Sequence, residues 1–347
     1  MGEAAAAGAR AGTGVTGDRT SGGRLDVEYV LPLRRSDADG DDLAELTGYL
    51  GALGRWVDVT VVDGSPGPVY RRHADAWSGL VRQVPPDPDL RYRNGKVNGV
   101  LTGVRAARHE RVVIADDDVR YRRDELVAVA ALLDDVDLVR PQNYFAPTPW
   151  HARWDTARTL LNRCLGGDYP GTFGLRRGTL LAAGGYDGDV LFENLELIRT
   201  VRAVGGTEAR PLDLYVRRLA PDPARFFGQR VRQAYDDFAQ PVRAAVFLAV
   251  LPGVLALLAA RRRKAVVVPF AASVALAEVG RRRGGGARVF PATSSLLAPA
   301  WVGERAVCIW LALGRRLLRG GVRYSGRRLR LAAHRQAYLR GRLRPAR

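Results

Sequence analysis

The first part of the chain alternates apolar runs of strand length with longer stretches that have helical periodicity. The strand-like runs are residues 25–33, 56–62 and 111–115, and the helix-like stretches are 42–53 and 96–108. Short apolar runs bounded by turn residues are typical of buried strands. Strands that alternate with helices favour a largely parallel sheet, so this pattern predicts an α/β fold.

The alternation continues less regularly to about residue 240. A strand is expected at 137–140 and a helix at 153–165, followed by a glycine-rich stretch at 166–185. An acidic helix start at 192–197 and an arginine-rich helix at 223–240 complete this part. We therefore expect one catalytic domain over residues 25–240.

Apolar segments dominate the chain after residue 240. Residues 244–260 contain no charged residue, residues 265–277 form a second uncharged run, and arginine clusters separate the runs. A membrane-spanning helix needs about 20 apolar residues, so the first run comes close to that length and the second is short. The pattern predicts transmembrane or interfacial helices over 241–318. The alternative is that they are buried core helices of a soluble protein.

The charge of the chain is distributed unevenly. The formal net charge is +18, yet residues 261–347 alone hold 21 arginines and lysines against two acidic residues. A nearly neutral domain followed by basic apolar segments is typical of attachment to an anionic membrane surface, and it argues against nucleic acid as the partner. Residues 319–347 are expected to form a basic tail. Residues 1–24, rich in alanine and glycine, are expected to be a disordered leader.

Acidic residues follow two of the predicted strands. Asp116, Asp117 and Asp118 come directly after the run 111–115, and Asp63 ends the run 56–62. In an extended segment the side chains of Asp116 and Asp118 would point to the same side. Two such carboxylates can hold Mg²⁺ or Mn²⁺, whose shell the phosphates of a substrate would complete. The simpler interpretation is an acidic turn that is merely solvated.

The order of motifs in residues 25–240 resembles glycosyltransferase family 2, whose catalytic domain has the GT-A fold. Pro32 closes the first strand as in that family, and Asp63 lies in a Val-Val-Asp-Gly-Ser segment. The further matches are Gly95-Lys96, the Asp-x-Asp of residues 116–118, Gly184-Gly185-Tyr186-Asp187, Glu193-Asn194-Leu195-Glu196-Leu197, and Gln229-x-x-Arg232. These motifs occur in the family's order and are followed by apolar segments, as in its membrane-bound members.

The resemblance implies a role for each matched residue. The implied donor-binding residues are Pro32, Asp63, Lys96, Asp116, Gln229 and Arg232, and the implied metal ligands are Asp116 and Asp118. Arg232 would also stabilise the departing diphosphate, because its planar guanidinium fits a phosphate group. The implied reaction is an inverting transfer of a sugar from a nucleotide-sugar to a lipid or other membrane-associated acceptor, on the cytoplasmic side of the cell membrane.

The chain departs from the family pattern at the catalytic base. Asn194 stands where the family has an aspartate, and an amide cannot accept a proton from an acceptor hydroxyl at neutral pH. Either Glu193 or Glu196 is then the base, or the protein binds nucleotide-sugars without catalysis. Gln233 replaces a tryptophan of processive members, which favours transfer of a single sugar. A membrane scaffold that binds polyanions through its arginine-rich tail is the remaining alternative.

Overall fold

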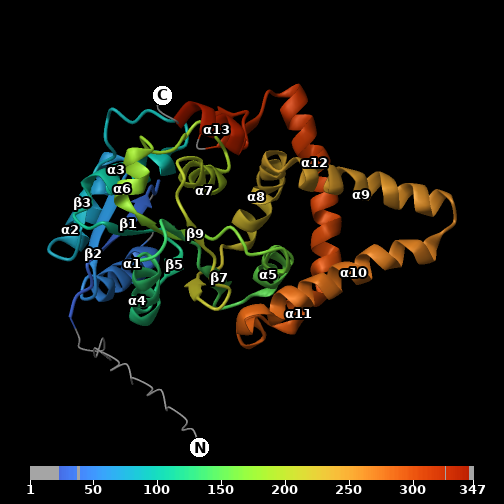
Figure 1. Ribbon diagram of the computed structural model, residues 1–347, viewed down its shortest axis with the longest axis horizontal. Coiled ribbons are helices and arrows are strands. Elements are labelled where there is room, and N and C mark those ends of the chain that lie inside the picture. Colours follow the sequence, from blue (N-terminus) through green and yellow to red (C-terminus); the bar gives the residue numbers. More distant parts are fainter. Residues whose placement is uncertain (1–22, 37–39, 325, 344–347) are drawn as a thin grey trace, which may run out of the picture.

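A computed structural model describes residues 23–36, 40–324 and 326–343 (Figure 1). The predicted leader lies almost wholly outside the described residues. The central sheet consists of β1 (Val27–Leu33), β2 (Asp58–Asp63), β3 (Arg82–Val84), β4 (Arg111–Ala115), β6 (Leu138–Val139), β8 (Thr172–Arg176) and β9 (Glu208–Ala209). Their order is β3-β2-β1-β4-β8-β6-β9.

The first four strands of this sheet are parallel, whereas β8 runs antiparallel to both of its neighbours. The mixed α/β fold with a mostly parallel sheet is therefore confirmed. Because parallel strands end at the same edge, Asp63 at the end of β2 and Asp116 just after β4 lie at one edge of the sheet. Three of the candidate residues predicted from the sequence, Lys96, Asp116 and Glu193, meet beyond this edge.

Helices cover both faces of the sheet. One face packs against α1 (Gly40–Leu53), α2 (Gly67–Trp77) and α4 (Arg123–Leu132), and the other packs against α3 (Gly95–Ala106), α6 (Arg177–Ala182) and α7 (Glu193–Ala203). The inner strand β1 is buried along almost its whole length, as expected for a strand covered on both faces, and Glu28 is its one charged residue.

The glycine-rich stretch 166–185 is not only a loop, because it contains β8 and α6. Gly174 is the reason that the hydrophobic pattern of the sequence did not predict β8. A side-chain carbon at position 174 would overlap Cγ1 of Val129 in α4, so this strand needs glycine where the helix crosses it.

A small second sheet connects the turn 116–118 at this edge to the later part of the chain. It consists of β5 (Val119–Arg120), β10 (Tyr215–Arg218) and β7 (Gln142–Phe145), in the order β5-β10-β7. The antiparallel pairing of β10 with β5 places Arg218 opposite Val119, directly beside the turn 116–118.

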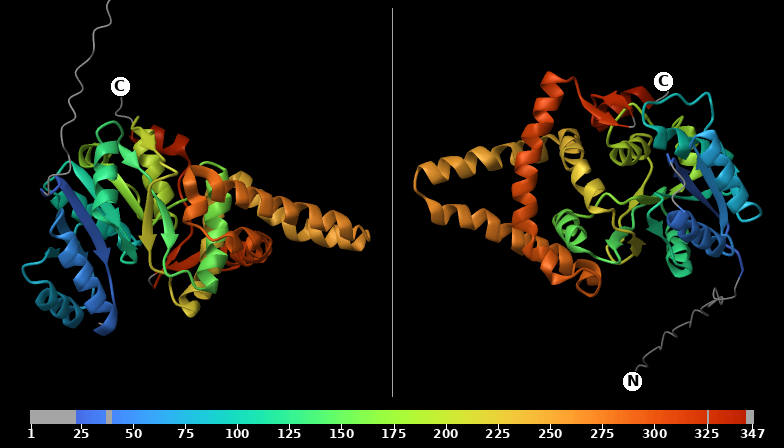
Figure 2. Two further views of the ribbon diagram at one scale, coloured as in Figure 1. Left: turned by 90° about the horizontal axis from the view of Figure 1, so that it is seen from below. Right: turned by 180° about the vertical axis from the view of Figure 1, so that it is seen from behind.

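The helical region combines elements from both sides of the change in composition near residue 240. The earlier elements are α5 (Trp150–Cys164), α8 (Pro223–Tyr235) and η1 (Asp236–Ala239), and the later ones are α9 (Pro241–Ala259), α10 (Arg263–Arg282), η2 (Arg283–Arg288), α11 (Ala292–Leu296) and α12 (Ala298–Leu318). Helices α9 and α10 form a hairpin that projects away from the α/β part in every view (Figures 1 and 2). Pro252 lies inside α9 without ending it.

Within the described residues, α9 is the one helix that is long and apolar enough to cross a membrane, and 11% of its most apolar window is buried. That helix is therefore not the buried core helix of the alternative interpretation. The base of the helical region is different, because α12 packs on α5 and α8 through a shared core that includes Leu160, Tyr235 and Trp301.

The basic segment after residue 318 folds back on the α/β part. It forms β11 (Val322–Tyr324), β12 (Arg327–Leu329) and α13 (Gln336–Leu343). The backbone N–H groups of Leu191 and Phe192 donate to the carbonyls of Leu331 and Ala332, so this segment lies directly beside the start of α7.

Candidate active site

The three consecutive aspartates form a turn rather than an extended segment. The N–H of Val119 donates to the carbonyl of Asp116 at 3.1 Å, which closes the turn, and the N–H of Asp116 donates to Gly171 at 2.8 Å. The extended geometry assumed from the sequence is therefore wrong. The side chains of Asp116 and Asp118 nevertheless meet, because both contact the guanidinium of Arg218.

Lys96 joins two motifs that are far apart in the sequence. It lies in the first turn of α3, where Asn94 caps the helix by accepting from the N–H of Lys96. Its Nζ lies 2.6 Å from Oδ1 of Asp116 and 3.0 Å from Oε1 of Glu193. The ammonium thus bridges the turn after β4 and the start of α7.

Arg218 is a site residue that the sequence did not reveal. Its Nε lies 2.9 Å from both carboxylate oxygens of Asp118, and its Nη2 lies 3.3 Å from Oδ2 of Asp116. The residue occurs in a Tyr-Val-Arg-Arg strand of an arginine-rich chain, so no motif distinguishes it from its neighbours. Only the pairing of β10 with β5 brings it to the aspartates.

The two metal-ligand candidates differ in their electrostatic environment. Burial by itself would raise the pKa of Asp116, but the charges of Lys96 and Arg218 outweigh it and lower that pKa. Burial also raises the pKa of Asp118, and the charge of Asp116 adds to this effect while Arg218 opposes it. The fixed cations therefore favour the charged form of Asp116 in particular.

The two candidate bases on α7 have different surroundings. The carboxylate of Glu193 accepts a hydrogen bond from Lys96 within the group just described. Glu196 is fully buried, and its two oxygens accept from the backbone N–H of His334 and face that residue's Nδ1, each at 2.8 Å. The structure thus brings Glu193 to Asp116 and engages Glu196 with the C-terminal segment.

Asn194, at the position of the family's catalytic aspartate, is held within the site. Its Nδ2 donates to the carbonyl of Pro170 at 3.0 Å, and its Oδ1 lies 3.5 Å from Nζ of Lys96. Both polar atoms of the Asn194 amide therefore have a partner within the site.

Helix α8 and strand β11 complete the far side of the site. The guanidinium of Arg232 lies 5.2 Å from the ring centre of Tyr324, and Gln229 lies on the same helix, partly buried. Burial raises the pKa of Tyr324, and the charge of Glu193 adds to that effect while Lys96 and Arg232 counter it. Tyr324 thus lies among the predicted residues, although the sequence placed it in a basic tail.

Asp236, just after α8, is a third residue near the site, after Arg218 and Tyr324, that sequence reasoning missed. Its Oδ1 is enclosed and has no hydrogen-bond partner among the described residues. Burial raises its pKa to about 8, the charge of Arg232 opposes that rise, and the charge of Glu193 adds to it. Its position four residues after Arg232 of the Gln-x-x-Arg motif was the available signal.

Asp63 and Pro32 occupy supporting positions. Asp63 is 1% exposed, and its carboxylate is engaged by Nδ1 of His73 at 2.7 Å, Nε2 of Gln83 at 3.0 Å and the N–H of Ser65 at 2.9 Å. In this arrangement it holds the loop after β2. Pro32 packs under α3, where a side-chain carbon on Gly99 would lie 2.9 Å from Cβ of Pro32. The donor-binding roles of both residues stay predictions.

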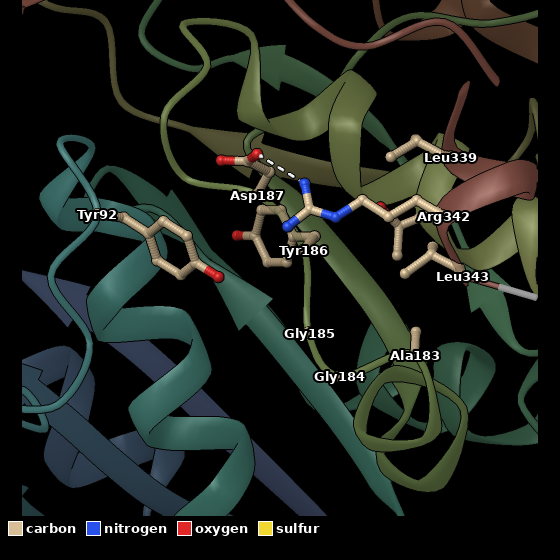
Figure 3. A pocket seen from close by; sticks show the side chains of 10 residues that line it. Tyr92, Ala183, Gly184, Gly185, Tyr186, Asp187, Leu339, Arg342 and Leu343 are labelled. Carbon is tan, nitrogen blue, oxygen red and sulfur yellow. Dashed lines mark ion pairs between the residues drawn. The ribbon is translucent and has the colours of Figure 1, made fainter. Parts of the chain in front are cut away.

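A small pocket of about 90 Å³ lies where α13 meets the Gly184-Gly185-Tyr186-Asp187 segment (Figure 3). Arg342 reaches from α13 toward Asp187 and pairs with it at 3.7 Å. A pocket for a drug-sized ligand has about 300–1,000 Å³, so this one alone cannot hold a nucleotide-sugar. The pocket is a small gap between α13 of the C-terminal segment and the 184–187 segment, which lie close together.

Among the described residues, one group of three potential metal ligands meets at the opposite end of the strands: Glu28, Asp58 and His109. Arg82 pairs with Glu28 at 3.1 Å, and Arg24 pairs with Asp58. These arginines already balance the carboxylates, so this group is explained as a structural network.

The residues at Asp116 and Asp118 fit a divalent cation in chemistry. Both offer carboxylate oxygens, which Mg²⁺ and Mn²⁺ prefer, and each side chain is 20% exposed and so reachable from solvent. The absence of a side chain at Gly171 keeps this space open, because a Cβ there would lie 2.6 Å from Oδ2 of Asp116. Arg218 spans the same oxygens and would have to move.

Comparison with known proteins identifies a glycosyltransferase segment. The family model of glycosyl transferase family 21 matches residues 68–147, which contain Lys96 and the triple aspartate. This match confirms the predicted resemblance to glycosyltransferases, although the matching model is that of family 21 rather than family 2. No curated protein matches the chain.

Three solved structures illustrate the likenesses. A mannosyltransferase from Pyrobaculum calidifontis, in complex with GDP-Man and Mn²⁺, is 20% identical over 83% of this chain and 87% of its own, with a TM-score of 0.47. Glucosyl-3-phosphoglycerate synthase from Mycobacterium tuberculosis, with Mn²⁺ and UDP, is 20% identical over 58% and 74%, with a TM-score of 0.37. TarS from S. aureus is 15% identical over 60% and 39%, with a TM-score of 0.41.

Proposed function

We propose that this protein is an inverting, metal-dependent glycosyltransferase that moves a sugar from a nucleotide-sugar to a membrane-associated acceptor. The observation that carries the proposal is the convergence of Lys96, Asp116, Asp118 and Glu193 at the carboxyl edge of the sheet. The segment matched by the glycosyltransferase family model supplies three of these four residues.

Each residue of the group has a role in such a transfer. Asp116 and Asp118 would hold Mg²⁺ or Mn²⁺, which neutralises charge on a nucleoside-diphosphate leaving group. Lys96 and Arg232 would contact the diphosphate, because a lysine and the planar fork of an arginine both suit phosphate oxygens. Pre-positioned cations of this kind stabilise the charge that develops as the bond to the sugar breaks.

Glu193 is the proposed base. It would accept the proton of the acceptor hydroxyl as that oxygen attacks the anomeric carbon from the face opposite the leaving diphosphate, so the configuration inverts. Glu196 is the less suitable candidate because its buried carboxylate already accepts hydrogen bonds from His334. We assign Glu196 to anchoring the C-terminal segment instead.

The acceptor is proposed to be lipid-linked or otherwise membrane-associated. The support is α9, whose exposed apolar surface projects from the domain, and the basic tip Arg261–Lys264 of the α9–α10 hairpin. Apolar residues beside a basic cluster favour an anionic cytoplasmic leaflet. The catalytic domain would then lie on the cytoplasmic side of the cell membrane.

A metal-dependent binding measurement tests this function. Calorimetry with UDP or GDP should show binding that requires Mn²⁺ or Mg²⁺ and that is strongly weakened in Asp118→Ala. Asp117→Ala is the matched control, because Asp117 belongs to the same turn but pairs with Arg35 at 3.6 Å. Equal binding by Asp118→Ala and the unmodified protein would refute the metal assignment.

A nucleotide-sugar-binding protein without catalysis is the second candidate, and Asn194 is the observation that favours it. Such a protein would bind the donor with metal and yet show neither transfer nor donor hydrolysis. Asn194→Asp separates the two cases, because a large gain in transfer would mean that the natural chain lacks an effective base.

A further inference from the structure

Arg218 occupies the position at the two aspartates where a metal ion would be coordinated. Its guanidinium contacts both oxygens of Asp118 and one oxygen of Asp116, at distances of 2.9 to 3.3 Å. The backbone is fixed there as well, because the N–H of Leu219 donates to the carbonyl of Asp118 at 2.7 Å. The pairing of β10 with β5 therefore fixes the backbone of Arg218 beside the two aspartates.

The arginine and a metal would compete for the same carboxylate oxygens. Arg218 already contacts Oδ1 and Oδ2 of Asp118 and Oδ2 of Asp116. Asp116 and Asp118 would hold the cation through their carboxylate oxygens, which are the oxygens that the guanidinium already contacts. The two positive groups would repel each other in a partly desolvated site.

The local charges indicate what would release the arginine. Three carboxylates, those of Asp116, Asp118 and Glu193, face two cations, Lys96 and Arg218, so these five groups carry one net negative charge. A divalent cation alone would make that charge positive. A diphosphate arriving with the metal restores negative charge and offers the guanidinium a bidentate partner.

We propose that Arg218 is a positioning residue that closes the Asp116–Asp118 pair to metal until the diphosphate of the donor draws its guanidinium away. Metal and nucleoside diphosphate then bind together, each strengthening the other by the same factor. This inference rests on the proposed function, because it assumes that the site binds a nucleoside diphosphate.

The test measures Mn²⁺ binding to the detergent-solubilised full-length protein by electron paramagnetic resonance, without and with UDP or GDP. In the unmodified protein, either nucleotide should tighten Mn²⁺ binding by about tenfold or more, a coupling within the usual allosteric range of 5–150-fold. Arg218→Ala should bind Mn²⁺ alone about tenfold more tightly than the unmodified protein, and the nucleotide should add much less.

Arg217→Ala is the matched control, because Arg217 precedes Arg218 on β10 but is exposed and donates to the carbonyl of Ala146 at 2.8 Å. It should behave as the unmodified protein. If Arg218→Ala does not fold, Arg218→Lys keeps the charge but loses the bidentate contact, and it should bind Mn²⁺ alone more tightly than the unmodified protein does.

The outcomes separate this inference from the proposed function. Unchanged affinity for Mn²⁺ alone in every folded Arg218 variant, with nucleotide binding intact, overturns the closing role and leaves the donor site standing. Absence of nucleotide binding in all proteins, with or without Mn²⁺, overturns the proposed function and the inference with it.

Discussion

At the scale of single residues, Glu193 and Glu196 have the same side chain, but we expect their substitution by glutamine to affect different properties. Glu193→Gln should lose about 10²–10⁴ in transfer rate, the contribution of a positioned general base, while donor affinity stays nearly unchanged. Glu196→Gln should keep most of the rate and lower thermal stability instead, because it weakens the contact with His334. Steady-state transfer assays and thermal unfolding measure the two effects. Full activity in both variants would remove the proposed base.

Asp236 predicts a pH dependence of stability. Its pKa is about 8 in the folded protein against an ordinary value of 3.8, so between these values the folded protein holds a proton that the unfolded chain has lost. This contribution to the free energy of unfolding is fully present below about pH 4 and is lost as the pH rises through 8.

In Asp236→Asn, which carries no such proton, denaturant unfolding between pH 5 and 8.5 should show a smaller fall in stability than in the unmodified protein. Some fall in the stability of Asp236→Asn with rising pH should remain, because burial also raises the pKa of Glu125 to about 7. Asp75→Asn, at an exposed position of α2, serves as the control. Parallel pH curves for all three proteins would contradict the burial of a protonated Asp236.

The sequence could predict site candidates only where they belong to motifs. Lys96, Asp116 and Glu193 each lie in a short segment with family-like neighbours, and the structure places Nζ of Lys96 2.6 Å from Asp116 and 3.0 Å from Glu193. Arg218 and Tyr324 could not be found in this way. Each reaches the site through strand pairing or chain return, which leaves no local trace in an arginine-rich sequence.

At the scale of elements, strands with continuous apolar sequence were predictable and short or glycine-containing strands were not. The strand expected at 111–115 coincides with β4. Strand β8 was hidden because Gly174 fits against Val129 and β10 because two of its four residues are arginines. Periodicity reports burial of side chains, so it fails where backbone packing or ion pairs hold the strand.

Gly174→Ala tests the packing of α4 on β8. Its added methyl group would overlap Cγ1 of Val129, so we expect a loss of about 1–3 kcal/mol in the free energy of unfolding, typical of overpacking in a core. Gly228→Ala, in α8 with no atom within 4 Å of the added carbon, should instead gain about 0.5–1 kcal/mol. Denaturant unfolding of both variants measures the difference. If Gly174→Ala is as stable as the unmodified protein, α4 can shift away from β8 without cost.

At the scale of the whole molecule, the helices after residue 240 share a hydrophobic core with earlier helices, although the sequence predicted a domain boundary there. The change in composition at residue 240 coincides with the start of α9, as expected. Packing does not follow that division, because one core unites Leu160 of α5 and Tyr235 of α8 with Trp301 of α12. Removing everything after residue 240 would expose this core, so the membrane interaction is better tested in the full chain.

The projecting hairpin predicts how the protein partitions between membrane and solution. Leu255 and Leu258 of α9 are 57% and 47% exposed, and burying such side chains in lipid contributes about 1.5–3 kcal/mol each. Leu255→Glu together with Leu258→Glu should therefore move much of the full-length protein into the soluble fraction after lysis, without loss of Mn²⁺-dependent nucleotide binding, because the site lies in the α/β part.

Leu80→Glu, which changes a leucine that is 41% exposed near the end of α2, is the matched control and should leave the protein in the membrane fraction. Sedimentation of lysates with and without detergent, followed by nucleotide binding on each fraction, measures both effects. If the unmodified protein is itself soluble without detergent, the hairpin binds something other than lipid. If the α9 variant stays in the membrane fraction and still requires detergent, attachment comes from the other exposed apolar residues of the hairpin, such as Val246, Val267 and Val268, or from the basic clusters after residue 260.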